Sequence, residues 1–223
     1  MRLELISFKI CPFVQRSVIT LHHKQTPFEI RFIDISDPPQ WFQDISPFGQ
    51  VPLLRVDHRH TLFESAVINE FLDEITPDSL LPSDPVKRAL DRSWIEFGSA
   101  CLLKLSGMIH AKEQKSFLVN RQALQKQFAW LETILGDGPY FNGPVLSLVD
   151  FAYAPLFMRT QMLNLDTDLH DPKNTPKTSR WGKNLLQLAC VQDSVVNDFR
   201  SLLAKRIAKA PYAAKKLLPA LQT

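Results

Sequence analysis

A cysteine directly before a proline, Cys11-Pro12, stands where an extended run of the chain gives way to a helical one. Proline favours the first position of a helix, because it has no N–H to leave unpaired there and its φ is already helical. A helix start also carries roughly half a positive charge and several free N–H groups, which stabilise an anion. A thiol there can therefore have a lowered pKa and act as a thiolate nucleophile. The alternative is that Cys11 is a small apolar side chain in the core.

A second candidate feature is the pair Glu64-Ser65, at the beginning of another helical segment. Serine is a preferred N-cap residue, and we expect Ser65 to be the N-cap of that helix. The same helix start could bind the carboxylate of a ligand, while Glu64 holds an adjacent ammonium group. A carboxylate beside an ammonium is the γ-glutamyl end of glutathione.

A small mixed domain must position these residues. The stretches "MRLELISF" and "FEIRFIDI" alternate as half-buried strands do, on either side of a helix that begins at Pro12. Two further short runs, "VPLLRV" and "TLFE", flank the turn "DHRH" and predict an antiparallel hairpin. The order βαβ, ββ, α matches the thioredoxin-like arrangement. The last helix is expected to bury Ala66, Ile68, Phe71, Leu72 and Ile75.

The rest of the chain predicts an all-α region. The stretch "TPDSLLPSDP" (76–85) carries three prolines and is typical of a linker. Helical patterns then follow at 86–111, 114–135, 148–164, 178–190 and 192–209. We therefore expect an α+β protein of two domains: a thioredoxin-like domain over 1–76, a linker over 77–85, and a helical bundle with a basic tail over 86–223.

Composition is ordinary for a globular protein, with 223 residues of which 45% are hydrophobic and 22% charged. Three widely separated cysteines do not form a disulfide framework and suit a reducing compartment. No signal segment opens the chain and no run of about 18 apolar residues could span a bilayer. These features predict a cytoplasmic protein that does not insert into membranes.

Charge is distributed unevenly along the chain. Residues 1–85 carry 7 Lys and Arg against 12 Asp and Glu, whereas residues 86–223 carry 19 against 11. No acidic residue follows Asp198, while six basic residues do. This tail is either a solvated final helix whose cations offset its dipole, or a docking surface for an acidic partner.

The chain resembles the cytosolic glutathione transferases, most of all their cysteine-type branch, the omega class and its bacterial relatives. The resemblance rests on collinear stretches between residue 5 and about residue 195, and together they are specific for the superfamily. These stretches are "CPFVQRS", "SPFGQVPLL", "FESAVINEFLDE", "LLPSDP", "LSLVDFAYAPLF" and "RWGKNLLQLACVQDS".

The resemblance implies that Cys11 is the catalytic thiol and that glutathione is the co-substrate. The residues it assigns to glutathione binding are Phe13, Val51, Pro52, Glu64 and Ser65. In thioredoxin-like proteins the proline at this place is cis, and the residue before it pairs with an extended peptide. The alternative is an ordinary trans proline at a strand start. The resemblance also implies a homodimer.

Two positions qualify this assignment. Omega-like proteins often carry a lysine that reaches the glycyl end of glutathione, and here Pro38 of "DPPQWF" stands in its place. Trp181 falls where omega relatives place an aromatic side chain in the pocket for the second substrate; the alternative is a tryptophan that anchors one helix on another. The stretch Ser147–Asp150 resembles the family's capping box and is assigned to folding.

No metal site is indicated by the sequence, because no Cys or His spacing suits zinc. Nothing in the chain favours nucleic acid as a partner.

The sequence thus predicts a glutathione-dependent thiol transferase or deglutathionylase, with dehydroascorbate reduction as a further activity. Val14 stands where a dithiol oxidoreductase has its second cysteine, so glutathione must resolve the mixed disulfide formed at Cys11. Two alternatives from other classes remain open. One is a non-catalytic regulatory module like the stringent starvation protein A family, favoured by Pro38 and the basic tail; the other is a carrier of hydrophobic ligands between the domains.

Overall fold

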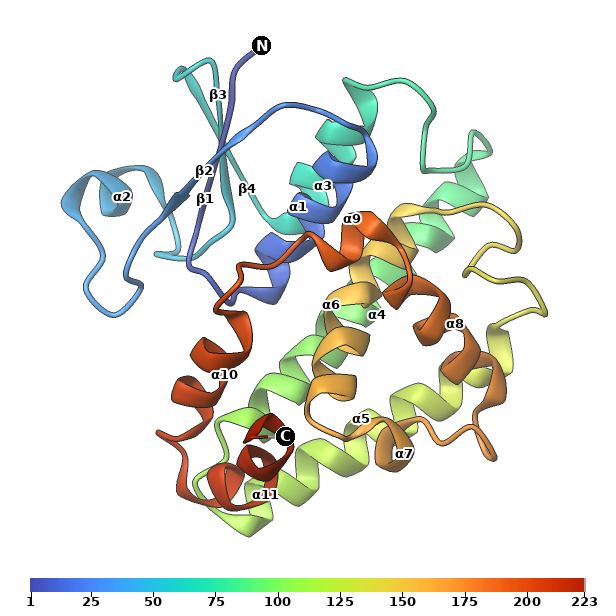
Figure 1. The fold of residues 1–223 in the computed structure, drawn as a ribbon. Helices are drawn as coiled ribbons and strands as arrows, with labels where there is room; N and C mark the ends of the chain where they lie inside the picture. The colour runs from blue at the N-terminus through green and yellow to red at the C-terminus, as the bar shows by residue number, and fades with distance from the viewer. Residues whose placement is uncertain (223) are drawn as a thin grey trace.

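A four-stranded mixed sheet forms the N-terminal part of the protein in the computed structural model, which describes residues 1–222 (Figure 1). The strand order is β2-β1-β3-β4. The central strand β1 (Leu3–Ser7) runs parallel to β2 (Glu29–Phe32) and antiparallel to β3 (Leu53–Val56), which forms a hairpin with β4 (His60–Phe63). The thioredoxin-like order of strands expected from the sequence is confirmed.

Helices cover both faces of this sheet. Successive side chains of β1 point to opposite faces, and both faces carry apolar residues that need to be covered. Leu5 packs in a cluster with the apolar sides of α1 (Pro12–His23) and α3 (Ser65–Glu74). Its neighbour Ile6 points to the other face, where it packs in a cluster with α2 (Gln40–Ile45). The crossover helix α1 follows β1 after a short loop, so Cys11 lies beyond the carboxyl end of this inner strand.

The structure corrects two details of this N-terminal part. The second strand was expected over 28–35 with one buried face, but β2 covers four residues and all of them are exposed, because it is the edge strand. In α3, Ile75 was expected on the buried side but is 37% exposed, whereas Asn69 and Asp73 are buried.

Asp73 is buried because it anchors the segment between α3 and α4 (Pro85–Ile109). Its Oδ1 lies 2.8 Å from Nζ of Lys24 and accepts from the backbone N–H of Leu80 at 2.8 Å, and its Oδ2 accepts from Ser79 Oγ at 2.9 Å. This proline-rich segment is therefore held against the sheet domain by a buried ion pair.

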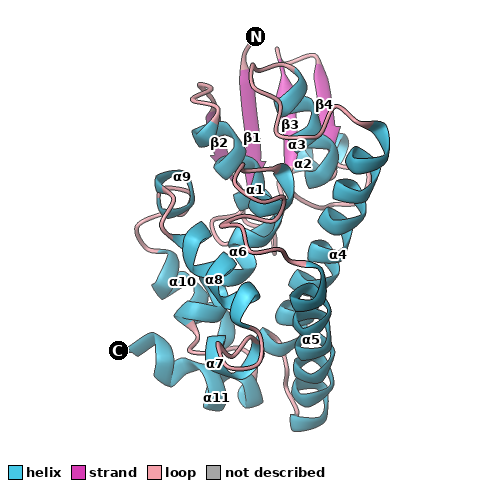
Figure 2. Ribbon diagram, turned by 90° about the vertical axis from the view of Figure 1, so that its right-hand side faces the viewer, coloured by secondary structure: helices cyan, strands magenta, loops and turns pink. Residues whose placement is uncertain are grey.

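Eight helices follow in the part of the chain that the structure describes (Figure 2). They are α4, α5 (Gln114–Ile134), α6 (Leu148–Met162), α7 (Asp166–Leu169), α8 (Pro176–Leu186), α9 (Ala189–Gln192), α10 (Phe199–Ile207) and α11 (Pro211–Gln222). The helix expected over 192–209 is broken between α9 and α10, and the tail adds α11, which the sequence analysis did not predict as a separate helix. None of the described helices is long and apolar enough to cross a membrane.

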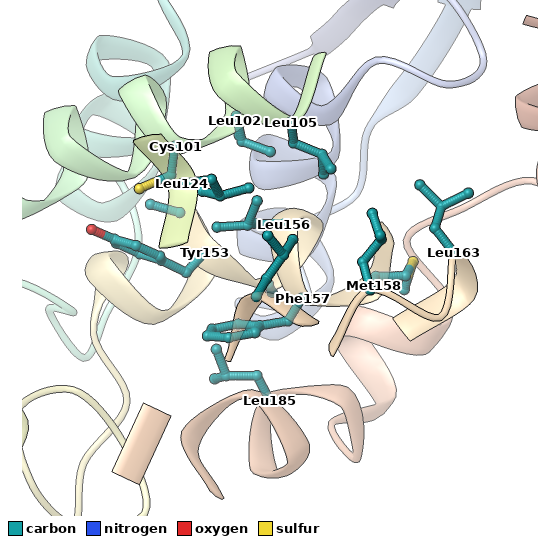
Figure 3. Packing of buried hydrophobic residues seen from close by; sticks show 14 of the residues in the cluster. Cys101, Leu102, Leu105, Leu124, Tyr153, Leu156, Phe157, Met158, Leu163 and Leu185 are labelled. Carbon is teal, nitrogen blue, oxygen red and sulfur yellow. The ribbon is translucent and has the colours of Figure 1, made fainter. Parts of the chain in front are cut away.

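Helix α6 lies at the centre of the helical domain. Every residue from 148 to 160 is buried, which is typical of a helix surrounded by others on all sides. Figure 3 shows Tyr153 and Phe157 of α6 packed among Leu124 of α5 and Leu185 of α8. The same helix contacts α1, and this contact brings the helical domain up against the candidate nucleophile.

Candidate active site

Cys11 occupies the N-cap position of α1, with Pro12 at the first helical position, as the sequence indicated. Its φ of −71° and ψ of 120° are extended, so the chain turns into the helix at the cysteine itself. The Cys11 side chain forms no capping hydrogen bond with the first turn of the helix. Cys11 is only 6% exposed, yet it lines a large cavity.

Burial raises the pKa of the Cys11 thiol, and this is the largest influence on it. The N–H groups of Val14 and Phe13 oppose the effect, followed by the positive charges of Arg159 and Arg16. The expectation that the helix start lowers this pKa below its ordinary value is not met, because burial acts in the opposite direction. The helix start and two guanidinium groups do favour the thiolate, but they do not outweigh desolvation there.

Arg16, about one turn into α1, is completely buried beside the site. Its Nε donates to the carbonyl of Ala152 at 2.9 Å, and its Nη1 donates to Ser99 Oγ at 2.8 Å and to Ser65 Oγ at 3.4 Å. Its Nη2 has no hydrogen-bond partner among the described residues. Burial lowers the pKa of Arg16 to about 10, so it remains a cation at neutral pH.

Arg159 of α6 is the second buried cation, 3% exposed. Its Nη1 donates to Gln15 Oε1 at 2.6 Å and to the carbonyl of Pro155 at 2.8 Å, and its Nη2 donates to the carbonyl of Ile10 at 3.0 Å. Burial lowers its pKa to about 10. No carboxylate of the described chain forms a salt bridge with Arg159 or Arg16. An anion at Cys11 would therefore balance uncompensated positive charge.

The other predicted binding residues surround the same cavity. The Val51–Pro52 peptide bond is cis, so of the two readings of this proline the cis form is the one observed. Glu64 has a φ of 68°, which is unfavourable for a residue with a side chain and is found mostly where a ligand or a tight turn requires it. Glu64 is the N-cap of α3 and Ser65 its first residue, so the expectation that Ser65 is the N-cap is wrong by one position.

The cavity has a volume of about 760 Å³ and lies between the sheet domain and the helical domain. The six residues that the resemblance assigned to catalysis and glutathione binding all line it. They are Cys11, Phe13, Val51, Pro52, Glu64 and Ser65. The opposite wall is formed by α4, from Glu96 to His110, and by Leu203 and Arg206 of α10.

Trp181 does not line this cavity; it is 1% exposed in the core of the helical domain. Its Nε1 donates to Asp150 Oδ1 at 2.6 Å, and its ring packs against those of Tyr153, Phe157 and Phe141. The assignment of Trp181 to the second-substrate pocket is therefore wrong, and the alternative, a helix anchor, describes what is observed. Asp150 also closes the predicted capping box with Ser147.

Three residues that line the cavity were not assigned to the site from the sequence: Arg159, His110 and Arg206. A basic residue inside the apolar run "APLFMRTQM" was a usable signal for Arg159, because an arginine in a fully buried helix needs an electrostatic reason. Arg206 had no such signal, since it is one of six basic residues in the tail.

Comparison with known proteins agrees with this geometry. Residues 10–75 match the model of the glutathione S-transferase N-terminal domain, and residues 88–181 match that of the C-terminal domain. The chain is 31% identical over 183 residues to rat glutathione S-transferase omega-1, covering 81% of this chain and 75% of the relative. The chain belongs to the glutathione S-transferase family. The relatives of this glutathione transferase include proteins of the omega class, as the sequence indicated.

One further relative and one solved structure are also similar to this glutathione transferase. It is 30% identical over 146 residues to the rice protein named probable glutathione S-transferase DHAR2, covering 65% of this chain and 50% of that protein. The crystal structure of glutathione transferase Omega 3C from Trametes versicolor superimposes with a TM-score of 0.77 at 27% identity, covering 88% of this chain and 90% of that one. The omega-like glutathione transferase fold is thus present over nearly the whole chain.

The position of Pro38 distinguishes this transferase from the omega pattern described above. Pro38 precedes α2, and its carbonyl accepts from Gln43 Nε2 at 2.8 Å. The nearby cation Arg31 stacks on the ring of Trp41, with its Cζ 4.3 Å from the ring centroid. Proline carries no cation, so Pro38 cannot supply the charge that a lysine offers at this position in omega-like proteins.

Proposed function

We propose that this glutathione transferase is a thiol transferase and deglutathionylase in which the Cys11 thiolate is the nucleophile. The observation that carries the proposal is the position of Cys11 at a helix start, beside two buried arginines that have no acidic partner among the described residues. These charges stabilise a thiolate, and they also stabilise the transition state in which negative charge spreads over the sulfur atoms.

The same cavity fits glutathione as co-substrate. In the proposed complex the cysteinyl backbone of glutathione pairs with Val51, the γ-glutamyl carboxylate binds at Ser65 and the start of α3, and its ammonium binds Glu64. Arg16 supports this arrangement, because its Nη1 reaches Ser65 Oγ and its buried Nη2 has no hydrogen-bond partner among the described residues. Phe13 packs beside the tripeptide.

The reaction follows from a single thiol. The Cys11 thiolate attacks the glutathionyl sulfur of a mixed disulfide, the S–S bond breaks, and the substrate leaves as a thiolate that takes a proton from water. A second glutathione thiolate then attacks the Cys11 mixed disulfide, restoring the Cys11 thiolate and releasing glutathione disulfide. Val14, three residues after Cys11, is 2% exposed. It has no thiol, so it cannot resolve the intermediate as a second cysteine at this position would. Glutathione is therefore the reductant.

A mass measurement tests the intermediate directly. After incubation with glutathione disulfide, we expect the intact protein to gain one glutathionyl group, located on the peptide that contains Cys11. The half-buried Cys190 and the fully buried Cys101 are internal controls, since neither lies in the cavity. No adduct, or an adduct on Cys190 alone, would contradict the proposal and would favour the regulatory module as the function.

The raised pKa of Cys11 predicts the pH dependence of its reactivity. Because only the thiolate reacts, alkylation of Cys11 by iodoacetamide in the ligand-free protein should accelerate as the pH rises through and above the ordinary thiol pKa of about 8.5. Arg159→Gln removes a cation that lowers this pKa, so the midpoint should move to higher pH. The exposed Arg180→Gln on α8 is the matched control and should leave the profile unchanged. A flat profile with full reactivity at neutral pH would show that the thiolate is already formed.

Dehydroascorbate reduction and a homodimer are further parts of this proposal, supported by the omega-class relationship. The first would proceed through the same Cys11 mixed disulfide. Sedimentation and an assay with dehydroascorbate and glutathione would test them separately.

A further inference from the structure

The far end of the cavity carries a cation that the proposed chemistry does not use. Arg206 of α10 lines the cavity wall opposite the sheet domain and is half-buried. Its Nε donates to Nε2 of His110 at 2.9 Å, which is its only hydrogen bond with the described part of the chain. The two terminal nitrogens of its guanidinium group are therefore available to a ligand.

The contacts of His110 hold the guanidinium group in place. Because an arginine Nε–H can only donate, Nε2 of His110 must be the acceptor, and the ring proton lies on Nδ1. Nδ1 is 2.8 Å from the carbonyl oxygen of Ser106 and donates to it. The chain of hydrogen bonds Arg206–His110–Ser106 thus directs one edge of the guanidinium group to α4. The other edge, with two parallel N–H groups, has the geometry that pairs with a carboxylate.

The location of α10 over the active site is itself fixed. At the start of α10, Nζ of Lys9 lies 3.2 Å from Oδ2 of Asp198. The ring of Phe199 packs under Arg159, with the arginine Cζ 5.0 Å from the ring centroid. These contacts join the helix to the loop before Cys11 and to α6.

Between the two ends of the cavity the wall is apolar. Leu102, Leu105 and Ile109 of α4 line it, together with Leu203 of α10 and Ile10. The two acidic side chains that line the cavity, Glu64 and Glu96, belong to the glutathione end. Glu96 precedes His110 by fourteen residues of one helix, which corresponds to about 20 Å at 1.5 Å per residue. Arg206, which contacts His110, is thus separated from Glu96, and no carboxylate of the described residues forms a salt bridge with it.

We infer that Arg206, oriented by His110, binds the carboxylate of the second substrate, and that this substrate is an apolar molecule ending in a carboxylate group. This inference rests on the proposed function, since it assigns the second substrate of the same site. Its glutathionyl sulfur lies at Cys11, its apolar body lies along the leucine-rich wall, and its carboxylate pairs with the free edge of Arg206.

The glycyl carboxylate of glutathione is the other source of the same chemistry, and the distances favour the second substrate. Arg16 links Ser65, at the γ-glutamyl end, to Ser99 of α4 through hydrogen bonds of 3.4 and 2.8 Å. Ser99 precedes His110 by eleven residues, or about 16 Å along the helix. A tripeptide that also pairs with Val51 has little length left to reach Arg206.

Ligand binding tests the inference without relying on turnover. Binding of 4-phenylbutyrate and of the uncharged 4-phenylbutanol would be measured by calorimetry in the presence of glutathione. We expect the carboxylate to bind the wild-type protein about tenfold more tightly, as a charge-assisted bidentate pair should. In Arg206→Gln this preference should disappear, while Arg206→Lys should keep part of it. Lys205→Gln, which removes a neighbouring exposed charge on the same helix, is the matched control and should keep all of it.

Several outcomes would overturn the inference. Equal affinities of the two ligands in the wild-type protein would do so, and so would a carboxylate preference that survives in Arg206→Gln. A weaker affinity of Arg206→Gln for glutathione, with no change for 4-phenylbutyrate, would assign Arg206 to the glycyl carboxylate instead. A lower melting temperature with an unchanged ligand preference would mean that Arg206 only stabilises the end of α4.

A kinetic comparison separates this inference from the proposed function. The substrates are mixed disulfides of glutathione with 6-mercaptohexanoate and with 6-mercaptohexanol. If the inference holds, kcat/KM for the carboxylate substrate falls about tenfold in Arg206→Gln and changes less than about twofold for the alcohol. Absence of turnover with both, while the carboxylate preference in binding persists, would refute the thiol transfer and leave the anion site standing.

Discussion

Replacing Cys11 with alanine is expected to lower thiol transfer from glutathione to hydroxyethyl disulfide by about a thousandfold or more, as removal of an enzymatic nucleophile commonly does. The physical reason is that no other thiol lines the cavity in the described chain, since Cys101 is buried in the helical core and Cys190 lies on α9. Val14 cannot substitute for the missing sulfur. The measurement is kcat/KM in the coupled glutathione reductase assay.

Glutathione affinity serves as the internal control for this variant. Because Val51, Glu64 and Ser65 are unchanged, Cys11→Ala should still be retained on immobilised glutathione. Cys190→Ala, which removes a half-buried thiol outside the cavity, should keep full activity. Full activity of Cys11→Ala would refute the mechanism, whereas loss of both activity and retention would indicate a misfolded site.

Replacing Asp150 with alanine is expected to produce the largest loss of stability, about 3–5 kcal/mol. Asp150 is completely buried, and its carboxylate accepts four hydrogen bonds. The donors are Ser147 N–H and Ser147 Oγ at 2.8 Å each, Phe141 N–H at 2.9 Å and Trp181 Nε1 at 2.6 Å. Removal of the carboxylate leaves these donors buried without a partner, and it also removes the cap of the central helix α6.

Thermal denaturation measures this loss. For a chain of this size the melting temperature should fall by about 10 °C. The melting temperature of Asp150→Asn should fall less. Its amide oxygen still accepts from Phe141 and Trp181, whereas its NH₂ group cannot accept from Ser147. Asp137→Ala removes an exposed carboxylate in the loop before α6 and should change the free energy of unfolding by less than about 0.5 kcal/mol. Equal melting temperatures for Asp150→Ala and Asp137→Ala would contradict this account.

Local patterns in the sequence were sufficient for most of the fold. Alternating strands, the proline at position 12 and the hairpin turn are properties of short segments, so the order βαβ, ββ, α was predictable. The capping box Ser147–Asp150 was predictable for the same reason, since its residues lie within one helical turn. The break between α9 and α10 was not, because the residues between them make contacts with distant parts of the chain, such as the hydrogen bond that Ser194 Oγ accepts from Gln15 Nε2 at 2.9 Å.

The site divides in the same way. Cys11, Val51-Pro52 and Glu64-Ser65 each belong to a local motif, so the residues that line the glutathione end of the cavity could be named from the sequence. Trp181 could not be assigned, because a tryptophan on an amphipathic helix fits a cavity wall and a core contact equally well. Its bond to Asp150 decides the matter, and that bond joins positions 31 residues apart.

The sequence by itself determined the fold family and singled out Cys11 as the proposed nucleophile, because motif chemistry is carried by neighbouring residues. Only the tertiary structure decided the electrostatics of that nucleophile. The pKa of Cys11 depends on how deeply the sulfur is buried and on two arginines, one of which, Arg159, comes from a distant helix. Likewise, Arg206 is one basic residue among many in the tail until α10 folds over the cavity and His110 orients it. Desolvation and charge pairing act through space, and their effect is therefore set by the packing of the two domains.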